Sequence, residues 1–183
     1  MTTPIHRIVL IGGGVRSGKS AFAIDLAQRM GHRPAFVATA TPSDGEMEDR
    51  IERHRQDRPE TFVTFEAPLA LAETLAALRG YDVVVVDCLT IWLSNLLLRE
   101  HSAESILEQV DRVVRVLEER RFHAVLVTNE VGMSVHPPTP LGRAIVEVSG
   151  WTHQRVARAA DRVYLAVLGM VVQIRPGLEP RHD

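Results

Sequence analysis

The chain has little cysteine, no long hydrophobic run and no basic excess. Cys88 is the only cysteine among 183 residues, so no disulfide can form within the chain, and a reducing compartment such as the cytoplasm is favoured. No apolar run approaches the roughly 20 residues that a membrane-spanning helix needs, so we expect no membrane span. The formal charge is only −2, which argues against a protein that holds nucleic acid by neutralising its phosphates.

Lysine is the scarcest of the charged residues. All but one of the 21 basic residues are arginine, and the exception is Lys19. A chain that uses arginine wherever a positive charge suffices is expected to keep lysine where a compact ammonium is needed instead of a planar guanidinium. Lys19 therefore marks a candidate site.

Hydrophobic residues make up 45% of the chain, enough for one full core, and we expect a single domain over residues 1–183. Strand-like and helix-like stretches alternate. We expect strands over 7–11, 35–38, 61–66, 82–87 and 124–128, and helices over 20–30, 46–57, 68–78, 90–99, 103–120 and 141–160, with a long loop over 129–142. The alternation predicts an α/β fold with a mostly parallel sheet and helices on both faces. Residues 163–168 and 170–174, split by Gly169, predict a C-terminal antiparallel hairpin.

Ligands on parallel sheets bind beyond the carboxyl ends of the strands. The segments that follow the expected strands are therefore the candidate site: residues 12–20, 39–41, 87–90 and 129–132.

The first of these segments is a complete phosphate-binding motif, which reads Gly13-Gly14-Val15-Arg16-Ser17-Gly18-Lys19-Ser20. It matches the P-loop pattern G-x-x-x-x-G-K-[ST] and lies between an expected strand and an expected helix. Its backbone amides can surround phosphates, Lys19 can reach the β- and γ-phosphates, and Ser20 can ligate Mg²⁺. The alternative is a glycine-rich turn with an incidental lysine, and the complete motif, its context and the sole lysine argue against it.

A second Mg²⁺ ligand is expected at the end of a buried strand. Asp87 follows the run Val83–Val86 and fits that place. The alternative is a strand-terminal aspartate that caps the next turn.

A histidine stands among arginines in the segment 50–59. Met47, Ile51 and His54 fall on one face of the expected helix, and Arg50 and Arg58 flank His54 one turn to either side. Neighbouring guanidinium groups disfavour the imidazolium, so His54 would be neutral near pH 7, as a nucleophile must be. The alternative is a solvated, salt-bridged helix, which is the usual meaning of such a charge run.

Four segments together resemble the bifunctional adenosylcobinamide kinase / adenosylcobinamide-phosphate guanylyltransferase family of cobalamin biosynthesis. They are the P-loop, Arg50-Ile-x-x-His54-Arg-x-x-Arg58-Pro59, Thr128-Asn-Glu-Val-Gly132 and Ala159-Ala-Asp-Arg-Val163. The P-loop is common to many proteins, whereas the second and third segments, taken together, are specific to this family. The resemblance runs over about residues 8–175 and implies a RecA-like subunit, a homotrimer and a multifunctional transferase.

The resemblance implies two reactions. In the first, ATP or GTP phosphorylates the aminopropanol hydroxyl of adenosylcobinamide. In the second, GMP passes from GTP to that phosphate and gives adenosylcobinamide-GDP. The family's helix histidine, which carries GMP as a covalent intermediate, corresponds here to His54.

The family's nucleotide contacts carry over to a defined set of positions, with Lys19 and His54 as the catalytic residues. The contacts are the P-loop residues 13–20, Ala38, Thr39, Ala40, Arg55, Gln56, Asp57, Arg58, Glu66 and Asp87, and the metal ligands are Ser20 and Asp87. The chain departs from the usual pattern at His153, where many members have Asn, and at Arg175, where others have Lys.

Several alternatives stay open. Glu130 can be a Mg²⁺ ligand, a base for the cobinamide hydroxyl, or a loop acid satisfied by backbone amides. The protein can be a P-loop small-molecule kinase without guanylyl transfer, in which His54 is structural, or a nucleotide-dependent switch without turnover. A DNA-dependent RecA-type ATPase shares the expected fold, but the slightly acidic charge balance opposes it.

Overall fold

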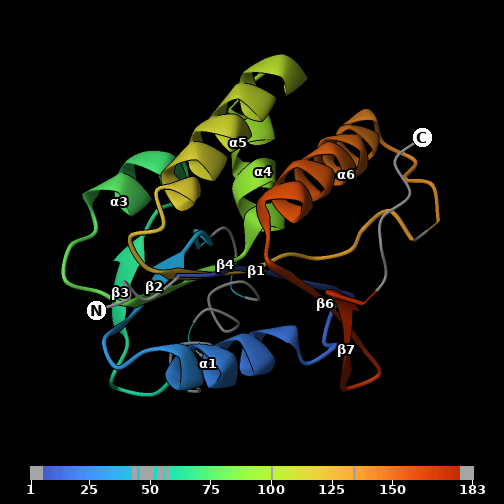
Figure 1. Cartoon of the computed structure of the whole chain (residues 1–183). Helices are drawn as coiled ribbons and strands as arrows, with labels where there is room; N and C mark the ends of the chain where they lie inside the picture. The colour runs from blue at the N-terminus through green and yellow to red at the C-terminus, as the bar shows by residue number, and fades with distance from the viewer. Residues whose placement is uncertain are drawn as a thin grey trace.

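One sheet organises the chain. The computed structural model describes residues 6–42, 45, 52, 56, 58–99, 101–133 and 135–177 (Figure 1). The strands are β1 Ile8–Gly13, β2 Pro34–Ala38, β3 Val63–Glu66, β4 Val83–Asp87, β5 His123–Val127, β6 Arg162–Val167 and β7 Met170–Arg175. Their order is β3-β2-β4-β5-β1-β6-β7, and every pairing is parallel except β6 with β7. The expected parallel sheet and its C-terminal antiparallel hairpin are confirmed.

Helices cover both faces of this sheet, as expected. They are α1 Lys19–Met30, α3 Leu71–Ala77, α4 Leu89–Leu98, α5 Ala103–Glu118 and α6 Pro140–Ala159. Helix α1 lies on one face, and α3, α4, α5 and α6 lie on the other (Figure 1). Within the described residues, no helix combines the length and the apolarity needed to cross a membrane. The helix expected over 46–57 falls almost wholly outside the described residues.

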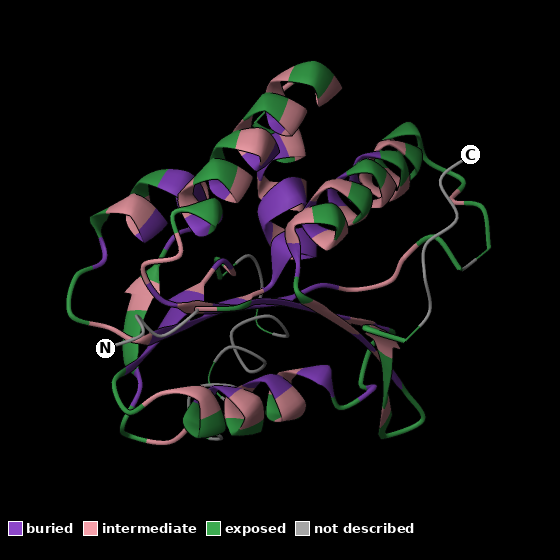
Figure 2. Ribbon diagram, viewed as in Figure 1, coloured by how far each residue is buried: buried purple, intermediate pink, exposed green. Residues whose placement is uncertain are grey.

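The central strands are buried on both sides. Val83, Val84, Val85 and Val86 of β4 are fully inaccessible to solvent, as a strand with helices on both faces must be. Figure 2 shows buried residues along the middle of the sheet and exposed ones on the outer faces of the helices. The continuous apolar run therefore fits the place of β4 inside the sheet, between β2 and β5, and Asp87 ends this buried strand.

Helix α3 begins at Leu71, so the helix start predicted at residue 68 is wrong. The carbonyl of Pro68 accepts a hydrogen bond from Asn95 Nδ2 at 3.0 Å, and the carbonyl of Leu69 accepts one from Trp92 Nε1 at 2.8 Å. Both donors belong to α4. Tertiary hydrogen bonds thus hold residues 68 and 69 outside the helix, although the Ala/Leu-rich pattern predicted them to be part of it.

Helix α6 begins at Pro140, which shortens the loop predicted over 129–142. Thr139 is the N-cap, and its hydroxyl accepts a hydrogen bond from the Gly142 amide at 3.1 Å. Proline is favoured in the first helical turn because its missing N–H would have had no partner there. The capping threonine, together with Pro140, fixes this boundary.

Asp161 fastens the start of β1 at the opposite edge of the sheet from the P-loop. Its carboxylate accepts a hydrogen bond from the Ile8 amide at 2.7 Å and pairs with the Arg120 guanidinium, whose Nη2 lies 3.2 Å from Oδ1. Burial alone would raise the pKa of Asp161, but the hydrogen bonds from Arg120 and Ile8 outweigh it, and the pKa is lowered. The ionised carboxylate therefore stabilises the fold.

Candidate nucleotide-binding site

The predicted site residues of the strands meet at one edge of the sheet. The register aligns Glu66 with Ala38, Ala38 with Asp87, Asp87 with Val127, and Val127 with Ile11. The P-loop starts two residues beyond Ile11. Because the strands are parallel, segments far apart in the sequence reach the same edge, where parallel sheets bind ligands.

The P-loop has the backbone that its glycines are expected to permit. Gly18 adopts φ 92° directly before α1, a left-handed conformation that glycine takes readily. At Gly13 a side chain would not fit, since a Cβ would lie 2.4 Å from the Ala166 carbonyl oxygen and 2.7 Å from Ser17 Oγ. The motif is therefore a close-packed turn seated against β6.

Polar groups gather inside this turn. Lys19 is 6% exposed, and its Nζ donates to the Gly14 carbonyl at 2.8 Å. Ser17 Oγ is buried, with no hydrogen-bond partner among the described residues. The amino terminus of α1 has neither a side-chain cap nor an acidic residue in its first turn, so its partial positive charge is not compensated there. This arrangement suits a phosphate group.

Two oxygen donors nearby suit Mg²⁺. Ser20 in the first turn of α1 and Asp87 at the end of β4 are both partly exposed. Mg²⁺ prefers oxygen ligands and is commonly held by one or two protein groups together with substrate phosphates. The described part of the chain contains no group of three or more His, Cys, Asp or Glu side chains that could hold a metal without such help. Ser20 and Asp87 therefore fit a metal that arrives with a nucleotide.

Thr39, a predicted nucleotide contact, holds the ends of β2 and β4 together. Its buried hydroxyl accepts from the Cys88 amide at 2.8 Å and lies 2.8 Å from the Cys88 carbonyl, to which it donates. Its neighbours Ala38 and Ala40 are partly exposed. A nucleotide contact by this segment stays a prediction, and the Thr39 hydroxyl serves to position the segment.

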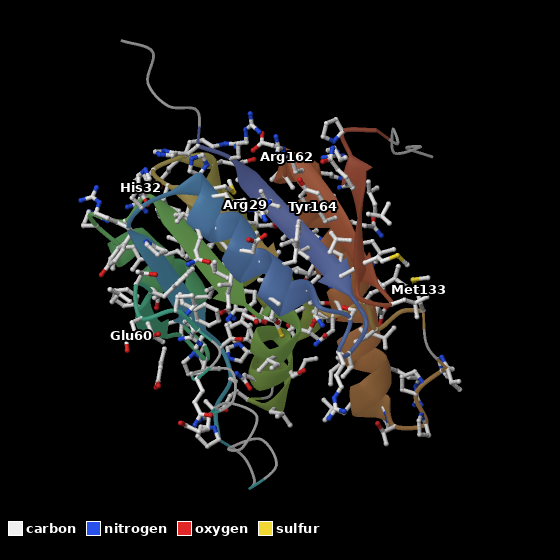
Figure 3. The ribbon with its side chains drawn as sticks, turned by 90° about the horizontal axis from the view of Figure 1, so that it is seen from below. Arg29, His32, Glu60, Met133, Arg162 and Tyr164 are labelled. Atoms are coloured by element: carbon white, nitrogen blue, oxygen red, sulfur yellow. The ribbon has the colours of Figure 1, made fainter. Side chains whose placement is uncertain are left out.

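Arg58 and Glu66 line a surface pocket of about 550 Å³, whose other lining residues are Pro59, Glu60, Phe62 and Thr64. The guanidinium of Arg58 lies 3.5 Å from the centre of the Phe36 ring and donates to Thr64 Oγ1 at 2.5 Å. Seen from the α1 side, Glu60 of this pocket and Met133 lie on opposite sides of α1 (Figure 3). Two predicted contacts thus share one pocket on the β3 side of the molecule.

Of the histidine segment, the structure describes only residues 52, 56, 58 and 59. His54, Arg55 and Asp57 lie outside the described residues. Gln56 is exposed and donates to Glu52 Oε1 at 3.0 Å. The approach of His54 to the P-loop therefore stays a prediction.

A polar cluster adjoins the P-loop and brings together residues that the sequence interpretation named separately, without predicting their contact. Thr90, Thr128 and His153 are linked by hydrogen bonds, and the His153 ring contacts Glu130. Burial lowers the pKa of His153, and the nearby Glu130 carboxylate offsets this only in part. One signal was available, since Thr152 interrupts the spacing of Val148 and Val156 on the buried face of α6, and His153 follows it directly.

Together the fold and the site define a protein with the P-loop NTPase fold. The RadB recombinase structure superposes on the chain with a TM-score of 0.57 at 14% identity, covering 95% of this chain and 83% of that one. At so low an identity the likeness concerns the fold alone.

The sequence comparisons are more specific. The family "cobinamide kinase / cobinamide phosphate guanyltransferase" matches residues 9–174. The bifunctional adenosylcobalamin biosynthesis protein CobP of Pseudomonas aeruginosa is 40% identical over 167 residues, which cover 91% of this chain and 96% of the relative. The protein named CobU in Escherichia coli is 33% identical, covering 92% of this chain and 99% of that one. The chain belongs to this family of enzymes, and the resemblance drawn from its motifs is confirmed.

Proposed function

We propose that this protein phosphorylates adenosylcobinamide with ATP or GTP and then transfers GMP from GTP to the product, which yields adenosylcobinamide-GDP. The observation that carries the proposal is the complete P-loop at the carboxyl edge of the sheet, with Lys19 held inside it, in a chain that belongs to the cobinamide kinase / cobinamide phosphate guanyltransferase family. Both reactions need a nucleoside triphosphate held by its phosphates, which is what this turn is built to do.

In the kinase step the P-loop amides and the Lys19 ammonium hold the nucleotide phosphates and stabilise the charge that develops on the leaving group. Ser20 and Asp87 would hold Mg²⁺, which neutralises phosphate charge when bound. The acceptor hydroxyl oxygen forms a bond to the γ-phosphorus, and the bond from that phosphorus to the β-phosphate oxygen breaks. Positioning and charge neutralisation supply the catalysis.

In the guanylyl step His54 is the nucleophile. Its neutral imidazole forms a P–N bond to the α-phosphorus of GTP, and pyrophosphate leaves. A phosphate oxygen of adenosylcobinamide phosphate then attacks the same phosphorus, so the P–N bond breaks and His54 is regenerated. Division of one transfer into two steps is the advantage of covalent catalysis. This part of the proposal rests on the sequence.

The proposal includes a single domain over residues 1–183, a homotrimer and action in the cytoplasm. Cys88 is the single cysteine of the sequence and is buried, so no disulfide can form within the chain, which supports a reducing compartment. Exposed apolar side chains on the C-terminal hairpin support association between copies, namely Val167, Leu168, Met170 and Val172. Light scattering of the purified protein tests the trimer.

One assay separates the proposed function from its rivals. The purified protein is incubated with adenosylcobinamide, GTP and Mg²⁺, and the corrinoid products are followed by mass spectrometry. The proposal requires the phosphate to appear first and the GDP ester to follow. Accumulation of the phosphate alone would make the protein a kinase without guanylyl transfer. Binding of GTP without any corrinoid product would identify a nucleotide-dependent switch.

A further inference from the structure

A line of hydrogen-bonding groups runs from the backbone at the end of β5 through two threonines to a histidine. The Asn129 amide donates to Thr90 Oγ1 at 2.9 Å, and Thr90 Oγ1 lies 3.0 Å from Thr128 Oγ1. Thr128 Oγ1 lies 2.7 Å from His153 Nε2. The other ring nitrogen, Nδ1, faces Glu130 Oε2 at 3.5 Å.

The backbone donor at one end and the distances along the line favour one direction for the hydrogen bonds. A backbone N–H can only donate, so Thr90 Oγ1 accepts from Asn129 and has its own proton to give. Thr128 is the nearer acceptor at 3.0 Å, since the Asn129 carbonyl lies 3.3 Å away. We assign the Thr90 proton to this nearer acceptor, so that Thr128 donates to Nε2 of His153 and the proton of the neutral ring lies on Nδ1, toward the Glu130 carboxylate. Successive donors in a buried site polarise one another in the same direction.

The neutral ring is consistent with its surroundings. The His153 side chain is only 14% exposed, and this burial lowers its pKa despite the facing carboxylate. The contact of 3.5 Å between Nδ1 and Oε2 is longer than an ordinary hydrogen bond. The contact is therefore weak: it places the ring beside Oε2 of Glu130 and leaves that oxygen able to accept a proton.

Glu130 lies beside the P-loop and remains open to a substrate. Its amide donates to the Gly13 carbonyl at 3.0 Å, which joins the loop after β5 to the phosphate-binding turn. Its Oε1 accepts from the Gly132 amide at 2.9 Å, so a hydrogen bond orients one carboxylate oxygen, and the His153 ring faces the other. The side chain is still 32% exposed. An oriented, reachable carboxylate next to bound phosphates is placed to act on the acceptor.

We propose that Glu130 is the general base of the alcohol phosphorylation and that His153 is its positioning residue. The inference rests on the proposed function, with a nucleoside triphosphate as phosphoryl donor and a primary or secondary alcohol as acceptor. The alcohol O–H bond breaks and its proton passes to the Glu130 carboxylate. The alcohol oxygen forms the new bond to the γ-phosphorus, and the nucleoside diphosphate leaves with the electron pair of the broken P–O bond.

The two reactions of the protein differ in their need for this base. The alcohol must lose a proton as it is phosphorylated, and a positioned base contributes about 10²–10⁴-fold to such a step. The acceptor of the guanylyl group is a phosphate, which is already an anion near neutral pH. Loss of Glu130 should therefore slow the kinase step far more than guanylyl transfer.

The first test is Glu130→Gln, which keeps the shape of the side chain and removes its basicity. We expect the kinase kcat to fall by about 10²–10⁴-fold. Guanylyl transfer, assayed separately with preformed adenosylcobinamide phosphate, should fall at least tenfold less than the kinase step. The matched control is Glu147→Gln, since Glu147 is an exposed acid on α6, and it should keep both rates. Equal losses of the two rates in Glu130→Gln, or a kinase rate within tenfold of wild type, would overturn the proposal.

The positioning role of His153 is tested by substitution with asparagine and with glutamine, whose side-chain amides replace different nitrogens of the ring. Asparagine keeps a donor near Nδ1, which faces Glu130, whereas glutamine keeps a polar group near Nε2, which contacts Thr128. We expect His153→Asn to retain the kinase kcat within about tenfold. His153→Gln should lose more than tenfold in kcat with little change in the KM for the alcohol. A purely structural histidine would give parallel losses in both variants, which would contradict the role proposed here.

His32→Asn serves as the histidine control, because His32 is exposed just before β2, at the opposite edge of the sheet (Figure 3). Thermal unfolding of each variant shows that the fold is retained. A wild-type protein that phosphorylates no corrinoid alcohol would overturn the proposed function and this inference with it. A wild type active in both steps, with a fully active Glu130→Gln, would overturn the inference alone.

Discussion

The ammonium of Lys19 donates to the carbonyl of Gly14 at 2.8 Å, so the first residue of α1 reaches back over the loop that precedes it. The side chain is enclosed, with 6% of its surface exposed. A compact ammonium fits this enclosure, whereas a planar guanidinium is wider and needs room for five donors.

We therefore expect Lys19→Arg to abolish both reactions, with losses of at least about 100-fold, the effect of removing one donor to a developing charge. Rates of both steps and GTP binding are measured together. The control is Arg29→Lys at the other end of α1, where the side chain is 72% exposed. Near-normal turnover in Lys19→Arg would contradict the special place given to the only lysine.

His54→Ala is expected to abolish guanylyl transfer and to affect the kinase step far less. The reason is chemical, since only the guanylyl step needs a nitrogen nucleophile. Wild-type protein incubated with GTP labelled at the α-phosphate should acquire label that is stable to alkali and released by acid, as a P–N bond requires. Persistence of that label in His54→Ala would exclude His54 as the attachment point.

Gly13→Ala should destabilise the protein and distort the P-loop. The added Cβ would lie 2.4 Å from the backbone oxygen of Ala166, and a backbone atom cannot move aside as a flexible side chain can. Overpacking of this kind costs about 1–3 kcal/mol. Gly14→Ala is the comparison for stability, because a Cβ there meets nothing within 4 Å. Free energies of unfolding are measured with denaturant. Equal values for the two variants would show that the P-loop backbone shifts to accommodate the added Cβ at little cost, against this prediction.

Asp161→Asn should lower the free energy of unfolding at neutral pH, and the size of this loss should depend on pH. Burial works to raise the pKa of Asp161, but the hydrogen bonds from Arg120 and the Ile8 amide prevail and lower it. A carboxyl with a lowered pKa in the folded state stabilises fully above its unfolded value of about 3.9 and loses this contribution as pH falls through the folded value.

The difference between wild type and Asp161→Asn should therefore be constant from about pH 5 to pH 7 and shrink below about pH 4. Urea unfolding across this range measures it. Asp25→Asn is the control, because Asp25 pairs with Arg29 on the exposed face of α1, where such pairs contribute little. A difference that stays constant down to pH 3 would refute the role of the ionised carboxylate.

Patterns within short stretches of sequence predicted the strands and most of the helices. The valine run 83–86 required a buried strand, and the P-loop required a turn between β1 and α1. The prediction was wrong at residues 68–70, where apolar spacing favours a helix. There, the side chains of Trp92 and Asn95 from α4 donate hydrogen bonds to the backbone carbonyls instead. These donors lie more than 20 residues further along the chain, so no pattern within the segment predicts them.

The sequence by itself determined the phosphate-binding turn, the α/β class and the family, because each depends on patterns within short segments and on their order along the chain. Only the tertiary structure decided that β5 lies between β4 and β1. That order brings Glu130 against Gly13 and His153 against Thr128. Side chains 25 positions apart, such as those of Thr128 and His153, meet only when strand order and helix packing bring them together. Their separation along the sequence does not indicate how far apart they lie in space.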